Sequence, residues 1–234
     1  MPLGFALDMN YVLLVMLPTL VLSGLAQLFV RNAYSRWSQQ RNSSGMTGLQ
    51  VAQQIFQRTN VRALDIEGTP GELSDHYDPG KNVVRLSQNV ATIPSVAAMA
   101  IVAHELGHVQ QHQENSVLIS MRNFLVPAVR FSPTIGYMLI VLGLIMQVTG
   151  MIYLGIALFG LMVVFMILTL PVEIDASRRG LALLRTAGLM QSDDDRSGSR
   201  QVLTAAAMTY LAAAITAVLQ LLYYLMLANR SNRD

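Results

Sequence analysis

The chain has 234 residues, of which 53% are hydrophobic and only 13% charged, and its formal net charge is +2. Globular domains usually carry about 25% charged residues, so this composition excludes soluble, disordered, collagen-like and coiled-coil proteins. The absence of cysteine excludes disulfides and Cys-based metal sites, and the small, scattered positive charge argues against nucleic-acid binding.

The first predicted element is a transmembrane helix at residues 9–30. This stretch between Asp8 and Arg31 is uncharged, and about 20 apolar residues suffice to cross a bilayer. A signal peptide is the alternative, but no basic residue precedes the stretch, and it is longer than the apolar core of about 7–15 residues that signal peptides use. We therefore expect a retained anchor.

Residues 31–130 form a polar region for which the sequence predicts a small α+β domain. Apolar periodicity predicts a helix over residues 47–59, with one face formed by Leu49, Ala52, Ile55 and Phe56. Alternating residues and turn signals over 61–87 predict a small antiparallel sheet, including a strand at 82–86. Pro94 then opens a predicted helix from Ser95 to about Gln113.

The longest uncharged stretch, residues 131–172, predicts two transmembrane helices. One helix of that length would reach about 63 Å, twice the hydrocarbon thickness of a bilayer. We expect spans at 131–148 and 151–172, joined by a turn. Residues 173–200 are polar again and predict a helix over 173–189 followed by a loop over 191–199. The uncharged stretch 201–229 predicts a fourth span.

The predicted hairpin determines which parts of the chain share a side of the membrane. Two consecutive spans begin and end on the same face, so regions 31–130 and 173–200 lie together. These regions carry nine and five Lys or Arg residues, against none in the N-terminal tail and two in the C-terminal tail. The positive-inside rule therefore predicts a multi-pass cell-membrane protein with both polar regions in the cytoplasm.

The residues that indicate chemistry lie on the helix that Pro94 opens. They read His104-Glu105-Leu106-Gly107-His108, an H-E-x-x-H pattern. Histidines at i and i+4 share a helical face and can converge on one Zn²⁺, while Glu105 can act as general base on the attacking water. Surface histidines beside an unrelated glutamate are the alternative, but the apolar segment 98–103 would bury the helix leading into them.

A catalytic zinc takes three protein ligands, and the sequence offers two candidates for the third. His112 lies about 12 Å along a straight helix from His104, so we interpret it as a surface or supporting residue. Glu173 ends a predicted span on the side of the two histidines, although a solvated helix end would look similar. Candidates to stabilise the oxyanion are His76, Tyr77, Arg178 and Arg179. Strand 82–86 could pair with a substrate main chain.

The motif has neighbours that together carry a family resemblance. Upstream are Ser74-Asp-His-Tyr-Asp-Pro79 and Val83-Val-Arg-Leu-Ser87, and downstream is Pro171-Val-Glu-Ile-Asp-Ala-Ser-Arg-Arg-Gly180. With the motif, these segments resemble the membrane zinc metallopeptidases called YugP-like over essentially the whole chain. The resemblance implies a gluzincin-type site similar to that of HtpX-like membrane proteases, with Glu173 as third zinc ligand.

One position departs from the HtpX-like pattern. Those enzymes carry Ala-Asp at the third and fourth positions after the ligand glutamate, whereas this chain carries Ala176-Ser177. Asp175 is the candidate to supply the missing carboxylate.

The sequence thus predicts a mainly α-helical membrane protein with four transmembrane helices and a zincin-like α+β polar domain. We expect a zinc metalloendopeptidase at the cytoplasmic membrane surface, with peptide or membrane-protein substrates, a lipid bilayer and no nucleic acid as partners. One alternative is a non-enzymatic membrane scaffold with a structural metal, which would need no base at Glu105. The other is a site-2-type intramembrane protease, but Glu105 and Glu114 are charged and no Asn-Pro-Asp-Gly segment is present.

Overall fold

The computed structural model describes residues 8–231, which fall into two compact units. The unit that we call the helical unit contains residues up to 26, residues 120–171 and residues from 209 onward. The other, the mixed unit, contains residues 27–119 and 172–208. Helices α2, α6, α8 and α9 contribute residues to both units.

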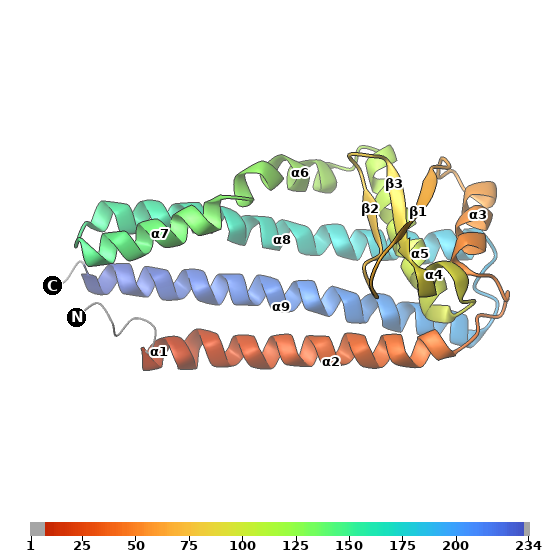
Figure 1. The fold of residues 1–234 in the computed structure, drawn as a ribbon, viewed down its shortest axis with the longest axis horizontal. Helices are drawn as coiled ribbons and strands as arrows, with labels where there is room; N and C mark the ends of the chain where they lie inside the picture. Colours follow the sequence, from red (N-terminus) through yellow and green to blue (C-terminus); the bar gives the residue numbers. More distant parts are fainter. Residues whose placement is uncertain (1–7, 232–234) are drawn as a thin grey trace. The chain divides into compact units, whose positions relative to one another are not determined.

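The helical unit is built from helices alone within the described residues (Figure 1). It takes in α1 (Met9–Tyr11), the π-helical turn η2 (Val12–Met16), the first part of α2 (Leu17–Gln39), most of α6 (Val117–Val129), α7 (Ser132–Ile145), the first part of α8 (Thr149–Thr186) and the last part of α9 (Asp193–Ser231). Its buried cluster consists of Val15, Ile140, Ile152, Ile156, Tyr223, Tyr224 and Ala228.

Three helical segments are long and apolar enough to cross a membrane, namely Met9–Gln39, Thr149–Thr186 and Asp193–Arg230. The predicted span 131–148 corresponds to α7, which has only 14 residues. Helices α6 and α7 pass the same test as a pair, but they are bent by 46°. Pro133 at the start of α7 explains the break, because proline lacks an N–H and clashes with the preceding turn, which here is the end of α6. A fourth span exists only if this bent pair counts as one.

The mixed unit confirms the two helices predicted in the first polar region. These are α3 (Gly48–Arg58) and α5 (Val96–Gln113). Thr47 and Ser95 cap them, because their side chains accept hydrogen bonds from the third residue of each helix. The packed face of α3 was predicted wrongly at Leu49, which is exposed, since Val51, Ala52 and Ile55 point inward instead.

The sheet is mixed, so the predicted antiparallel sheet is wrong. Its strands are β1 (Asp65–Thr69), β2 (His76–Asp78) and β3 (Val83–Ser87), in the order β1-β3-β2. Strands β2 and β3 form the expected hairpin, but β1 runs parallel to β3. The turn residues at 79–82 predict only the hairpin of β2 and β3. The pairing of β1 with β3 joins strands that are separated in sequence by β2, so it has no local signal. Because β3 is central, it has no free edge for a substrate.

Two predicted boundaries in the second polar region are also wrong. Helix α8 continues through Pro171 to Thr186, so Glu173 lies inside a helix. The expected loop over 191–199 is mostly helical, because α9 begins at Asp193. Ser192 Oγ accepts the backbone N–H of Asp195 at 3.0 Å, and three aspartates occupy the first turn. Both features favour a helix start in a segment without apolar periodicity.

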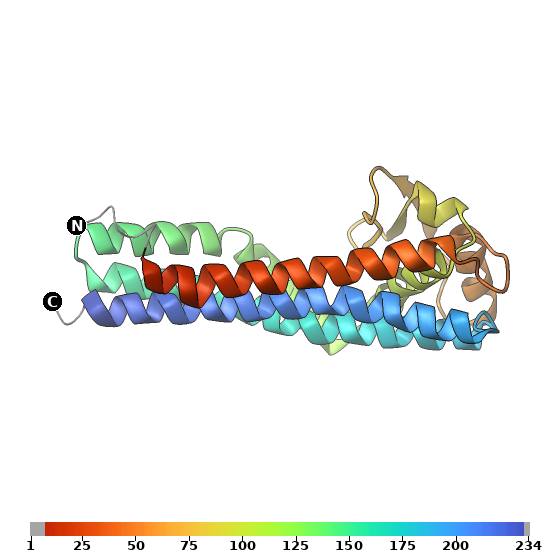
Figure 2. The same cartoon turned by 90° about the horizontal axis from the view of Figure 1, so that it is seen from below.

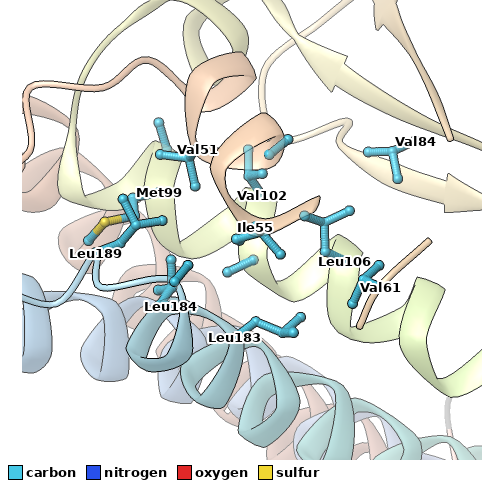
Figure 3. Close-up of a cluster of buried hydrophobic side chains, with 14 of the residues drawn as sticks. Val51, Ile55, Val61, Val84, Met99, Val102, Leu106, Leu183, Leu184 and Leu189 are labelled. Carbon is cyan, nitrogen blue, oxygen red and sulfur yellow. The ribbon is translucent and has the colours of Figure 1, made fainter. Parts of the chain in front are cut away.

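Two clusters of buried side chains hold the mixed unit together. In one, Trp37 at the end of α2 packs with Val202 and Leu203 of α9 and with the start of α5. Figure 2 shows the same end of α2 beside α9. The other lies among α3, β3, α5 and the end of α8, as drawn in Figure 3. There Met99, Val102 and Leu106 of α5 meet Leu183 and Leu184 of α8. This packing fixes the motif helix against the helix that carries Glu173.

Candidate metal centre

The candidate metal ligands come from α5 and α8, whose backbones approach closely at two glycines. A β-carbon on Gly107 would stand 2.3 Å from the carbonyl oxygen of Ala176. A β-carbon on Gly180 would stand 2.7 Å from the carbonyl oxygen of Ala103. Real β-carbons do not approach backbone atoms this closely, so a side chain at either position would push the helices apart. Glycine at 107, inside the H-E-x-x-H motif, therefore brings α8 within reach of the histidines.

Three side chains converge where the helices meet. One ligand atom from each of His104, His108 and Glu173 lies within 4.8 Å of the others. Glu173 Oε2 is 3.3 Å from His104 Nε2 and 3.4 Å from His108 Nε2. Tetrahedral zinc with ligands at 2.0–2.2 Å separates any two of them by about 3.3–3.6 Å. The two measured separations agree with this value, so the donor set suits a zinc ion in both chemistry and spacing.

The charge distribution also suits a cation. The side chain of Glu173 is only 4% exposed, and its Oε2 has no hydrogen-bond donor in good geometry. A buried carboxylate oxygen without a donor is unfavourable, and a bound cation would compensate it. Burial raises the pKa of Glu173, but the adjacent imidazoles outweigh burial and hold that pKa well below its usual range. Burial lowers the pKa of His108, but Glu173 outweighs it and the pKa is raised.

Each histidine is also held at its second ring nitrogen by a neutral side chain. Ser177 Oγ lies 3.1 Å from His104 Nδ1, and Gln111 Oε1 lies 3.0 Å from His108 Nδ1. These contacts leave the Nε2 atoms facing Glu173. The sequence analysis named Ser177 only as the position where a carboxylate is missing, and it did not assign Gln111 to the site. The signal available was spacing, because Gln111 follows His108 by three residues and Ser177 follows Glu173 by four.

Asp175 reaches the histidines only through Gln111. The Gln111 amide group donates to Asp175 Oδ2 at 2.7 Å and to the carbonyl oxygen of Val172 at 2.9 Å. Arg179 Nε also donates to Asp175 Oδ2 at 2.7 Å. Asp175 thus makes no direct contact with either imidazole, and the expectation that it replaces a carboxylate at Ser177 does not match its position.

Glu105 is buried beside the ligands and is held by the sheet. The backbone N–H of Tyr77 in β2 donates to Glu105 Oε2 at 2.8 Å. Strand β2 pairs with β3 along one edge only, and the Tyr77 N–H lies on its other edge. Glu105 therefore has one oxygen fixed by the edge strand.

The remaining predicted residues lie apart from the three ligands. Helix α5 is unbroken through Gln113, and His112 Nδ1 contacts the Tyr77 hydroxyl at 3.1 Å. His76 is exposed, with Nδ1 at 2.8 Å from the carbonyl oxygen of Ser74. Arg178 is exposed, and Arg179 is bound to Asp175 and Glu114. None of these contacts identifies a side chain that would stabilise an oxyanion.

Comparison with known proteins shows the family of the chain. The sequence profile of the family described as "Putative neutral zinc metallopeptidase" matches residues 12–229. The chain belongs to this family. It is also 36% identical over 206 residues to a protein of Bacillus subtilis (strain 168) named "Putative membrane protease YugP", and the alignment covers 88% of this chain and 91% of that relative. The resemblance inferred from the motifs is thereby confirmed. No solved structure matches the chain.

Proposed function

We propose that the protein is a zinc-dependent endopeptidase in which His104, His108 and Glu173 hold the metal and Glu105 is the general base. The observation that carries the proposal is the convergence of the three ligand atoms within 4.8 Å, with Glu105 buried next to them. Three protein ligands leave the fourth zinc position open, which is typical of catalytic sites. A structural metal would give no reason for a carboxylate fixed beside the ligands.

The proposed mechanism assigns a proton transfer to Glu105. Bound zinc would supply a Lewis acid that polarises the peptide carbonyl and lowers the pKa of water toward about 7. Glu105 would take the proton from the attacking water and return it to the leaving amine. The Tyr77 N–H holds one carboxylate oxygen, so the other oxygen is available for the proton.

Strand β2 is the element that we propose binds the substrate. The central position of β3 excludes the strand that the sequence suggested. The edge of β2 that β3 does not cover lies next to Glu105, to which its Tyr77 N–H donates, so a peptide extended beside this edge would pass the general base. Main-chain pairing of this kind recognises extended backbone more than side chains, which suits an endopeptidase with broad sequence tolerance.

We further propose that the site faces the cytoplasm at the membrane surface. The support is the three membrane-length helices, the excess of Lys and Arg in regions 31–130 and 173–200, and the place of Glu173 directly after the predicted span 151–172. Four spans, with the bent pair α6 and α7 as one of them, would satisfy this arrangement. Peptides and exposed loops of membrane proteins are the substrates that such a site could reach.

The test is cleavage of casein by purified protein, measured together with bound zinc. We expect Glu105→Gln to retain zinc and lose at least about 10²-fold in turnover, because only the proton transfer is removed. His104→Ala should lose the zinc itself. Glu67→Gln, at an exposed carboxylate of β1, is the matched control and should behave like wild type. Wild-type cleavage by Glu105→Gln would exclude the mechanism and favour a structural metal.

A further inference from the structure

A pocket of the mixed unit lies away from the metal ligands. It has a volume of about 890 Å³ and is formed by α2, the end of α8, the following loop and the start of α9. None of the three candidate ligands lines it. A volume of this size is in the usual range for sites that take a small organic molecule.

The lining of this pocket is positively charged. Arg185 of α8 and Arg196 and Arg200 of α9 line it together with one carboxylate, Asp193, so the lining carries a formal charge of +2. Asp193 pairs with Arg196 at 2.9 Å. Within residues 8–231, Arg185 and Arg200 have no ion-pair partner, and both are exposed. Guanidinium groups present forked donors that match a phosphate group well.

Three residues of the lining are apolar, and their place in the sequence is informative. Phe29, Leu181 and Met190 contribute apolar side chains. Phe29 belongs to the predicted span 9–30, and Arg200 directly precedes the predicted span 201–229. The pocket thus contains residues from the ends of two apolar segments, where a helix passes from hydrocarbon to water. Arginines at this level attract anionic headgroups of the cytoplasmic leaflet.

We propose that this pocket binds the phosphate group of an anionic phospholipid, with Arg185 and Arg200 as its principal donors and Phe29, Leu181 and Met190 against the lipid's glycerol and upper acyl chain. The two arginines without ion pairs provide donors that no carboxylate within residues 8–231 occupies. A zwitterionic lipid carries a choline cation that the same arginines would repel. The site is independent of the proposed peptidase activity.

The chain contains its own reporter for this pocket. Trp37 is the single tryptophan, and its indole N–H donates to Gln201 Oε1 at 2.6 Å. Gln201 lines the pocket. A ligand that moves Gln201 or changes its surroundings should therefore alter the fluorescence of Trp37.

The experiment titrates the full-length protein, in a non-ionic detergent, with short-chain phosphatidylglycerol while Trp37 emission is recorded. Short-chain phosphatidylcholine and inorganic phosphate are titrated in parallel. We expect saturable binding of phosphatidylglycerol, at least about tenfold tighter than either of the other two. Arg185→Gln/Arg200→Gln should weaken phosphatidylglycerol binding by at least about tenfold, since each charged hydrogen bond typically contributes that much.

Arg58→Gln/Arg62→Gln is the matched control, because it removes the same charge from exposed positions outside the pocket. It should bind phosphatidylglycerol like wild type. Single Arg185→Gln and Arg200→Gln variants repeat the test if the double variant does not fold. Equal losses in the pocket and control variants would overturn the proposal, as would equal affinity for phosphatidylcholine. Inorganic phosphate binding as tightly as the lipid would show that the ligand is a soluble anion instead.

Discussion

Gly107 of α5 faces the carbonyl oxygen of Ala176 in α8 so closely that a β-carbon on the glycine would stand 2.3 Å from it. Gly107 stands between His104 and His108 in the motif on α5. Ala176 follows Glu173 by three residues on α8. Backbone atoms cannot move aside as a flexible side chain can. The distance between these two residues therefore determines whether the three ligands can share one ion.

We expect Gly107→Ala to weaken zinc binding and to destabilise the protein. The added methyl group must separate α5 from α8, and overpacking of this kind costs about 1–3 kcal/mol. Zinc content after purification and the melting temperature measure the two effects. Gly160→Ala in α8 is the control, because a β-carbon there would meet no atom within 4 Å. A Gly107→Ala variant with wild-type zinc affinity would show that helix spacing does not govern the site.

The choice of third ligand can be tested by comparing two variants. Glu173→Ala should bind zinc far more weakly than wild type, because two histidines leave two coordination positions to water. His112→Ala should bind zinc almost normally, since its ring contacts Tyr77 and lies on an unbroken helix. Competition with a zinc-chelating dye gives both affinities. If His112→Ala lost the metal while Glu173→Ala kept it, the ligand assignment would be wrong.

Membrane orientation can be tested with single cysteines, because the chain contains none. We expect Met146→Cys, in the turn between α7 and α8, to react with an impermeant thiol reagent added to intact cells. Gln57→Cys and Ser197→Cys, at exposed positions of the polar regions, should react only after the cells are permeabilised. The opposite labelling pattern would place the metal centre outside the cell.

The sequence predicted the parts of this protein that depend on local signals. Histidines at i and i+4 on a capped helix follow from spacing, and uncharged stretches mark the membrane-length helices. The parallel pairing of β1 with β3 was missed because it joins strands separated by β2. The start of α9 was missed because the segment has no apolar periodicity, although Ser192 and the three aspartates of the first turn mark it locally. Gln111 and Ser177 were missed because their roles depend on how closely α5 and α8 approach.

Asp195 provides a test of stability against pH. This carboxylate is fully buried and accepts hydrogen bonds from the backbone N–H groups of Ser43 and Ser192, both at 3.1 Å, and from the Ser43 hydroxyl. Burial raises the pKa of Asp195, but these hydrogen bonds outweigh burial and the pKa is lowered. A lowered folded-state pKa contributes stability above the unfolded value of about 3.9 and loses it as pH falls further.

We therefore expect Asp195→Asn to lower the free energy of unfolding at pH 7 by about 1–3 kcal/mol, because an amide cannot accept all of these bonds. The difference from wild type should stay constant down to about pH 4 and shrink below it. Thermal unfolding in detergent across pH 3–8 measures this. Asp194→Asn, in the same turn but exposed, should have little effect. A wild-type advantage that persisted unchanged at pH 3 would contradict the assignment.

The last prediction concerns the side chains that hold the histidine rings. Gln111 is fully buried, and its amide nitrogen faces two acceptors, Val172 and Asp175, so its oxygen must face His108 Nδ1. His108 Nδ1 then carries the proton, and His108 Nε2 is left to bind zinc. Gln111→Leu should weaken zinc binding by about 10- to 100-fold, as loss of such outer contacts typically does. Ser177→Ala should weaken zinc binding to a similar extent, because Ser177 Oγ lies 3.1 Å from His104 Nδ1 and holds that ring.

Asp175→Asn should weaken zinc binding less than Gln111→Leu, because Asp175 acts on His108 only through Gln111, and asparagine can still accept the Gln111 amide. Gln110→Leu, on the neighbouring position of α5 and bonded to Glu114, is the control and should retain wild-type affinity. Zinc affinity is measured for all four variants beside their melting temperatures, so that loss of fold is separated from loss of ring orientation. Should Asp175→Asn prove as damaging as Gln111→Leu while both fold normally, the acid would have a larger share in orienting His108 than its distance from the ring implies.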